Sequence, residues 1–287
     1  MNHPAAMDAG RVAVAVGPSA AGAARAALEL GWEVEEVADL EQAGDLLVRA
    51  DAGLRSALVL AALGDFPTEA FLRLAARLCR EAGSLGVGFA YGRSAEQLLA
   101  AVRRLGAPDP APVGEPLHAA LAHPHFADLF SGTRVVRAVG PGAPPADELL
   151  TAGAEMLYIM GHSTGHEALL GGAVICRREA LEESPRPERA FPCYSGAACH
   201  YQGTAVHRVD ADRVKARVAV LLACSIASPR SPFSPETMIG DGLGASGGVR
   251  TLVTTLRTTR AGRDDFLPLY YACRMGLTMG QAVALAN

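Results

Sequence analysis

The chain has 287 residues, of which 50% are hydrophobic and 20% are charged, and its formal net charge at pH 7 is -4. This composition excludes general disorder, which goes with few apolar residues, and argues against a general nucleic-acid binder, which would be basic. No apolar run reaches the roughly 18 residues of a membrane span, and the first residues lack the apolar stretch of a signal peptide. We therefore expect a cytoplasmic protein with six cysteine thiols, and neither a membrane nor a nucleic acid among its partners.

The first hundred residues alternate short apolar segments with Ala- and Leu-rich segments of helical length. Strands are expected at 11–16, 33–37, 56–63 and 86–91, and helices at 19–30, 40–50, 68–82 and 95–105. Ser19 stands where the first helix would take its N-cap. Strands alternating with helices in this way imply βαβ units and a parallel sheet. We therefore predict an N-terminal α/β subdomain over residues 10–105.

A Pro-rich stretch follows this subdomain. Four prolines lie between Ala107 and Pro116. Proline continues neither a helix nor a central strand, because it lacks the backbone N–H that both need. We therefore expect a linker over residues 106–133.

The second half again has the texture of an α/β fold. Strands are expected at 134–139, 156–160, 218–222 and 250–256, a hairpin at 168–176, a Gly-rich turn at 242–248, and two closing helices at 264–275 and 278–286. The predicted fold class is therefore α/β throughout, with 134–287 as the second domain.

Two of these strands end in residues that can do chemistry together. The strand 156–160 runs into His162, and the strand 218–222 runs into Cys224, 62 residues later. Parallel strands of one sheet place their carboxyl ends on the same edge, where α/β active sites are built. A thiol beside an imidazole is the arrangement that a cysteine nucleophile needs. The same cysteine could also be a small buried apolar residue at a strand end.

Four segments of the second half, in order, resemble the caspase-like cysteine peptidases of clan CD, and within them the CHAT domains. They are Leu157-Tyr-Ile-Met-Gly-His162, Val220-Leu-Leu-Ala-Cys224, the segment 244–256, and 266–271 with 276–283. The resemblance covers roughly residues 134–287. It implies a caspase-like parallel-sheet sandwich whose N-terminal companion is an inactive caspase-like or flavodoxin-like subdomain.

The resemblance also implies roles for individual residues. Cys224 would attack the scissile carbonyl of a protein or peptide substrate, and His162 would protonate the leaving amine. Backbone N–H groups of Cys224 and of the residue after the histidine would hold the oxyanion. In the family that residue is usually glycine, whereas this chain has Ser163. The expected activity is that of a cysteine endopeptidase, and a catalytically inactive binding scaffold is the alternative that this departure suggests.

A second alternative uses the same segment. Gly161-His-Ser-Thr-Gly165 fits the G-x-S-x-G elbow of α/β-hydrolases, with Ser163 as the nucleophile. That fold places its catalytic histidine late, yet no histidine follows His207. Gly171 and Gly172 also follow closely, which disfavours the helix that an elbow opens.

Metal-ligating residues occur in two places. His162 and His166 are four residues apart beside Glu167, and Cys193, Cys199 and His200 form a second group. Structural zinc sites usually contain tighter cysteine pairs, so we expect neither a metal nor another cofactor.

Three carboxylates after the cysteine are candidates for a substrate pocket. Asp241, Asp264 and Asp265 could favour a basic residue before the cleaved bond.

Overall fold

The structure of the chain is a computed structural model. The structure describes residues 10–49, 56–82, 85–90, 92–107, 117–121, 134–137, 146–160, 162–169, 173–177, 194–195, 198–199, 201–222, 238–245 and 248–254, with Leu269 and Met275. The chain divides into two compact units, one formed by Met1–Ala107 with Gly262–Asn287 and the other by Pro108–Ala261.

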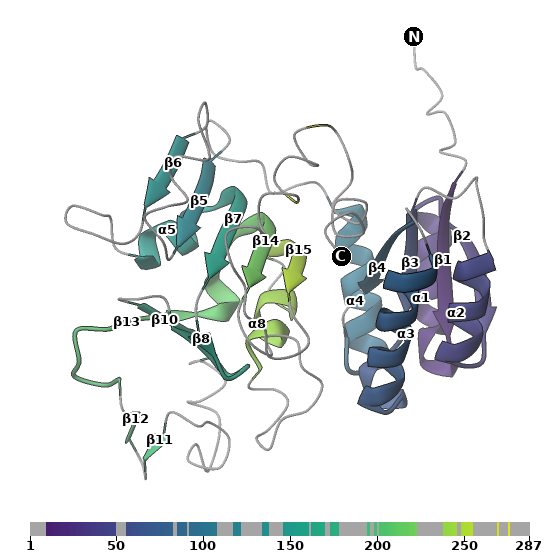
Figure 1. Cartoon of the computed structure of the whole chain (residues 1–287), viewed down its shortest axis with the longest axis horizontal. Helices are drawn as coiled ribbons and strands as arrows, with labels where there is room; N and C mark the ends of the chain where they lie inside the picture. Colours follow the sequence, from purple (N-terminus) through teal and green to yellow (C-terminus); the bar gives the residue numbers. More distant parts are fainter. Residues whose placement is uncertain are drawn as a thin grey trace. The chain divides into compact units, whose positions relative to one another are not determined.

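The N-terminal unit is a parallel four-stranded sheet between two pairs of helices (Figure 1). Its strands are β1 (Arg11–Val16), β2 (Glu33–Val37), β3 (Ser56–Leu60) and β4 (Gly86–Ala90), in the order β2-β1-β3-β4. Its helices are α1 (Ala21–Glu29), α2 (Leu40–Arg49), α3 (Thr68–Glu81) and α4 (Ala95–Gly106). This strand order, with helices on both faces, is that of a doubly wound sheet.

The side chains of β1 explain how the two helix pairs pack. Val12, Val14 and Val16 share a core with α2 and α3, whereas Ala13 and Ala15 share a core with α1 and α4. Successive residues of a strand point to opposite faces, so the Val/Ala alternation gives β1 larger side chains on one face and smaller ones on the other. The Ala-rich α1 packs on the face of Ala13 and Ala15, with four of its own alanines buried.

One predicted cap is wrong. Ser19 lies inside a short 3-10 turn, η1 (Pro18–Ala20), and α1 starts after Ala20 with no side-chain cap. Proline at the first position of that turn starts the helical conformation early, so Ser19 is one of the turn's own residues. In α4, by contrast, the Ser94 hydroxyl accepts a hydrogen bond from the Gln97 N–H at 3.3 Å.

The second unit is built on a parallel five-stranded sheet in the order β15-β14-β7-β5-β6. Its strands are β5 (Leu117–Leu121), β6 (Arg134–Arg137), β7 (Ala154–Met160), β14 (Ala216–Leu222) and β15 (Val249–Thr254). Strand β5 lies within the stretch that the sequence assigns to the linker, and it pairs with both β6 and β7. Its five residues contain no β-branched side chain, so the usual signal of a strand is absent.

A second sheet, in the order β13-β10-β9-β8, packs against the first. Its strands are β8 (His162–Ser163), β9 (Glu167–Leu169), β10 (Ala173–Cys176) and β13 (His207–Asp210), and a separate hairpin joins β11 (Tyr194–Ser195) to β12 (Ala198–Cys199). Ala168, Ile175 and Val209 of this sheet share one core with Ile159 and Leu221 of the five-stranded sheet. Leu150 of α5 (Ala146–Ala152) belongs to the same core.

The predicted Gly-rich turn is instead largely a helix, α8 (Ile239–Ala245). A Cβ added to Gly242 would lie 2.8 Å from the Ala211 Cβ in the 3-10 turn η4 (Ala211–Arg213), and 3.1 Å from the Arg177 side chain. Glycine is therefore used here for close packing of a helix, at some cost in helix propensity. The predicted closing helices lie outside the described residues, except for Leu269 and Met275.

The predicted fold class is confirmed, because both units are α/β with parallel sheets. Within the described ranges, no helix combines the length and the apolar character that crossing a membrane requires.

Candidate active site

The two strands that lead to the candidate dyad are direct neighbours. Strand β14 pairs with β7 in parallel, and the last pairs are Leu221 with Ile159 and Leu222 with Met160. Each residue of β14 therefore lies opposite the residue of β7 that precedes it by 62 positions. The described parts of both strands end at these last residues, which lie side by side at the carboxyl edge of the sheet.

His162 and Cys224 follow these two points at equal distances along the chain. His162 comes two residues after Met160, as the first residue of β8, and Cys224 comes two residues after Leu222. Cys224 and the side chain of His162 lie outside the described residues. The spacing still matches the register of the sheet. The paired strand ends are 62 residues apart in the sequence, and so are His162 and Cys224.

A tight hairpin holds the backbone at His162. His162 pairs with Leu169 and Ser163 with Ala168, both antiparallel, and the Thr164 N–H donates to the Glu167 carbonyl at 3.2 Å. Gly165 begins the two-residue loop with a φ of 90°, a conformation that L side chains rarely adopt. The Ser163 hydroxyl accepts a hydrogen bond from the Gly165 N–H at 2.8 Å, which closes the turn from inside.

Helix α8 anchors the tip of this hairpin. The Ile239 N–H, at the start of α8, donates to the Gly165 carbonyl at 2.9 Å. His166 beside it is only 2% exposed, and Ala168 is fully buried. The segment that follows Cys224 in the chain is thus tied to the segment that follows His162.

The pairing pattern also fixes the direction of the Ser163 N–H. In an antiparallel pair, hydrogen-bonded and non-hydrogen-bonded residue pairs alternate. Because Thr164 and Glu167 form a hydrogen-bonded pair, the adjacent pair, Ser163 and Ala168, is non-hydrogen-bonded. The Ser163 N–H is therefore directed away from β9, on the outer side of the last strand in the sheet order.

The alternative elbow geometry does not fit this segment. An α/β-hydrolase elbow leads from a strand into a helix. Here the residues after Gly165 form strand β9, antiparallel to β8. Ser163 accordingly lies in a hairpin strand rather than at a strand-to-helix turn.

Three buried polar residues form a row across the second sheet. Cys176 pairs with Glu167 on one side and with Asp210 on the other, and all three are at most 9% exposed. Burial, followed by the charge of Asp210, raises the pKa of the Cys176 thiol from its ordinary 9.0 to about 12. Cys176 is therefore a poor nucleophile near neutral pH.

Glu167 was singled out in the sequence only as a neighbour of the two histidines. Its Oε2 atom is buried and has no hydrogen-bond partner among the residues that the structure describes. A three-residue strand carries no signal from which this burial could be predicted.

The remaining candidate residues are only partly placed. Asp241 lies in the first turn of α8 and is 8% exposed, whereas Asp264 and Asp265 lie outside the described residues. Of the second cysteine group, Cys199 is a buried free thiol in β12, and Cys193 and His200 lie outside the described residues. A search of the residues that the structure describes finds no group of three or more potential metal ligands.

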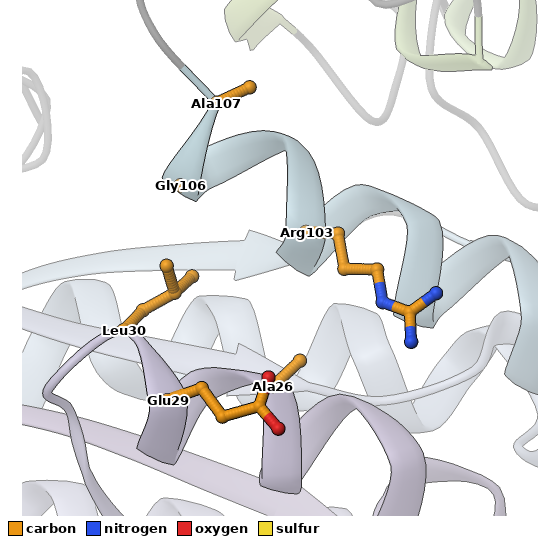
Figure 2. Close-up of a pocket in the computed structure, with 6 residues that line it drawn as sticks. All are labelled: Ala26, Glu29, Leu30, Arg103, Gly106 and Ala107. Atoms are coloured by element: carbon orange, nitrogen blue, oxygen red, sulfur yellow. The ribbon is translucent and has the colours of Figure 1, made fainter.

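A surface hollow of about 270 Å³ lies in the N-terminal unit, between the ends of α1 and α4 (Figure 2). It is lined by Ala26, Glu29, Leu30, Arg103, Gly106 and Ala107. A Cβ on Gly106 would collide with the Leu30 side chain, so the glycine lets the two helix ends approach. None of the candidate site residues within the described ranges lines this hollow.

No protein-family model matches the chain, and no curated protein matches it. The solved structures that are similar to it include two of one cysteine proteinase. The Arg-specific cysteine proteinase gingipain R (RgpB) aligns with a TM-score of 0.58 at 10% identity, over 97% of this chain and 72% of its own. The complex of the pro- and mature domains of Porphyromonas gingivalis RgpB aligns with a TM-score of 0.50 at 8% identity, over 96% of this chain and 77% of its own.

At these identities the likeness concerns the fold. It includes both units, because it covers nearly the whole chain. The chain has the mixed α/β, caspase-like fold of gingipain R.

Proposed function

We propose that this protein is a cysteine endopeptidase that cleaves a specific protein or peptide, with Cys224 as nucleophile and His162 as general acid–base. The observation that carries the proposal is the pairing of Met160, at the end of β7, with Leu222, at the end of β14. His162 and Cys224 each follow two residues after one of these paired residues. The caspase-like fold of a cysteine proteinase supports it independently. The order of motifs in the second half further suggests a relationship to CHAT domains.

The reaction would run through an acyl-enzyme. Cys224 gives its thiol proton to His162, its sulfur forms a bond to the scissile carbonyl carbon, and the carbonyl π electrons move to oxygen. The intermediate then collapses, the C–N bond breaks, and His162 gives its proton to the leaving amine. Water, deprotonated by His162, hydrolyses the thioester and restores the thiol.

Backbone donors would stabilise the negative oxygen. The Ser163 N–H is directed away from β9 and is one candidate, and the Cys224 N–H is the other. Preorganised donors of this kind are often the largest single contribution to acyl-transfer catalysis. The hairpin bonds at Gly165 would keep the first donor in place.

We also propose a basic residue before the cleaved bond. Asp241 is a buried carboxylate in the segment after Cys224, and Asp264 and Asp265 are further candidates. The similar structure, gingipain R, is itself Arg-specific. Profiling the cleavage of a peptide library tests this part, and a preference for neutral or acidic residues before the cut would refute it.

The dyad itself is tested by covalent labelling. The purified protein is treated near neutral pH with a peptidyl acyloxymethyl ketone, and its intact mass is measured. We expect one adduct, absent in Cys224→Ala and in His162→Ala. Cys176→Ala and Cys199→Ala are matched controls, because both thiols are buried, and they should keep the adduct.

An adduct that persists without Cys224 would refute the proposal. Labelling of Ser163 by a fluorophosphonate would then support a serine hydrolase. A protein that reacts with neither reagent and retains an uncut partner would be a binding scaffold.

A further inference from the structure

The Ser163 side chain has a hydrogen-bond donor that no described residue accepts. Its hydroxyl oxygen accepts from the Gly165 N–H at 2.8 Å, and its hydroxyl hydrogen is donated to no group in the described part of the chain. A hydroxyl has one donor and two acceptor sites, so this contact occupies one acceptor site and leaves the donor available. The Gly165 contact also restricts where the hydroxyl can turn.

The sheet register shows which way Ser163 faces. Residues directly opposite each other in an antiparallel pair share one face of the sheet, so Ser163 lies on the face of Ala168. Ala168 is fully buried in the core that contains Ile159 and Leu221. Those two residues belong to the last pairs of β7 and β14. Ser163 therefore lies on the face of the second sheet that packs against the five-stranded sheet.

Within the described part of the chain, Ser163 therefore has two donors that no group accepts. The Ser163 N–H is directed away from β9, and the hydroxyl has its hydrogen to give. The backbone nitrogen and the hydroxyl oxygen of a serine are close enough to bind one anionic atom together. Glycine at this position would supply the first donor only.

We propose that Ser163 is a catalytic residue that gives the oxyanion a second hydrogen bond, from its hydroxyl, beside the bond from its N–H. This inference rests on the proposed peptidase function. As the Cys224 sulfur bonds to the scissile carbon, the carbonyl oxygen takes up the π electrons and both donors of Ser163 contact it. When the C–N bond breaks, the carbonyl re-forms and both contacts weaken.

The substitution Ser163→Ala removes the hydroxyl and keeps the N–H. Loss of one oxyanion donor costs other enzymes about 100- to 1000-fold in kcat, and since the backbone donors remain here, we expect a loss of roughly 10- to 100-fold. Ser163→Thr keeps a hydroxyl on the same carbon and should recover at least part of that loss. Thr204→Ala is the matched control, because the Thr204 hydroxyl also accepts from the N–H two residues ahead, at Val206.

Two reagents separate an oxyanion role from a structural one. A peptide aldehyde forms a tetrahedral adduct with an oxyanion, whereas iodoacetamide alkylates the Cys224 thiol without one. For Ser163→Ala we expect the aldehyde affinity and kcat/KM to fall by the same factor, with an unchanged rate of alkylation. Thr204→Ala should change neither.

Equal aldehyde affinity in Ser163→Ala and the unsubstituted protein, with a reactive Cys224, would overturn the role of Ser163 alone. A parallel loss of alkylation rate would assign the hydroxyl to the thiol or the hairpin and would also overturn it. A Cys224 that is unreactive in the unsubstituted protein would refute the peptidase proposal and this inference together.

Discussion

The two parallel sheets of this chain use the carboxyl ends of their strands differently. In the N-terminal unit, Asp39 follows β2 and caps α2, accepting from the Glu41 and Gln42 N–H groups at 2.9 and 2.8 Å. Ser94 follows β4 and caps α4. In the second unit, β7 leads into His162, and β14 leads toward Cys224.

The comparison shows that a parallel α/β topology brings the carboxyl ends of its strands together at one edge of the sheet. The residues at that edge determine whether it serves structure or catalysis. Polar side chains that follow β2 and β4 satisfy the N–H groups of the next helix, which is a structural task. After β7 the chain turns into a second sheet instead, and the hairpin at Gly165 supports its backbone. Fold similarity therefore gives the place of a site, and its residues must give the function.

The largest contrast should appear in turnover. With a peptide substrate obtained from library profiling, Cys224→Ala and His162→Ala should each lower kcat about 1000-fold or more, because the members of a nucleophile–base pair act as a unit. Asp39→Ala, at the equivalent edge of the other sheet, should leave kcat unchanged. A comparable loss in Asp39→Ala would contradict the division of tasks.

A change in the backbone geometry of the hairpin at Gly165 should lower kcat. Gly165→Ala forces a side chain onto a φ of 90°, at a cost of about 1–2 kcal/mol, and a 1 Å displacement at a reacting group can cost about 100-fold in rate. Gly203→Ala is the control, because Gly203 has a φ of 77° with no atom within 4 Å of an added Cβ.

Both glycine variants should lower the free energy of unfolding in urea by similar amounts. Only Gly165→Ala should also lower kcat. Equal kcat values in Gly165→Ala and Gly203→Ala would show that the backbone geometry of the hairpin does not affect catalysis.

Stability at alkaline pH should depend on Cys176. Its pKa is about 12 in the folded protein and 9.0 in its ordinary environment, so as pH rises the unfolded chain loses this proton first. The associated stability is intact below pH 9 and is lost between about pH 9 and 12, at up to about 1.4 kcal/mol per pH unit. Urea unfolding of Cys176→Ala should show a shallower decline over this range, and parallel curves for the two proteins would refute the assignment.

The smallest effect is expected in the N-terminal unit. Asp39→Ala removes the acceptor for two N–H groups and should lower the free energy of unfolding by about 1 kcal/mol. Asp39→Asn keeps a side-chain oxygen that can accept these bonds, so it should retain most of the free energy of unfolding. Thermal unfolding measures both, and an unchanged midpoint in Asp39→Ala would contradict the capping role.

The sequence predicts much of the sheet framework, because buried parallel strands are short apolar runs. Segments 11–16, 33–37 and 218–222 all lie in observed strands, and the hairpin at 168–176 corresponds to β9 and β10. The two strands whose carboxyl ends suggested the candidate dyad also lie in one parallel sheet, where β7 and β14 are neighbours.

Other features depend on tertiary contacts that no local pattern carries. Strand β8 has two residues, and its partner is set by the turn at Gly165. The helical state of Gly242 depends on its packing against Ala211 and Arg177. The burial of the Glu167 carboxylate and the direction of the Ser163 donors depend on the register of the second sheet.

The most direct test of the central claim is a crystal structure of the protein with the acyloxymethyl ketone inhibitor bound. The register of β7 and β14 predicts an adduct on the Cys224 sulfur, with the His162 imidazole within about 4 Å of it. An adduct on another residue, or a His162 imidazole more than about 7 Å from the Cys224 sulfur, would contradict the account.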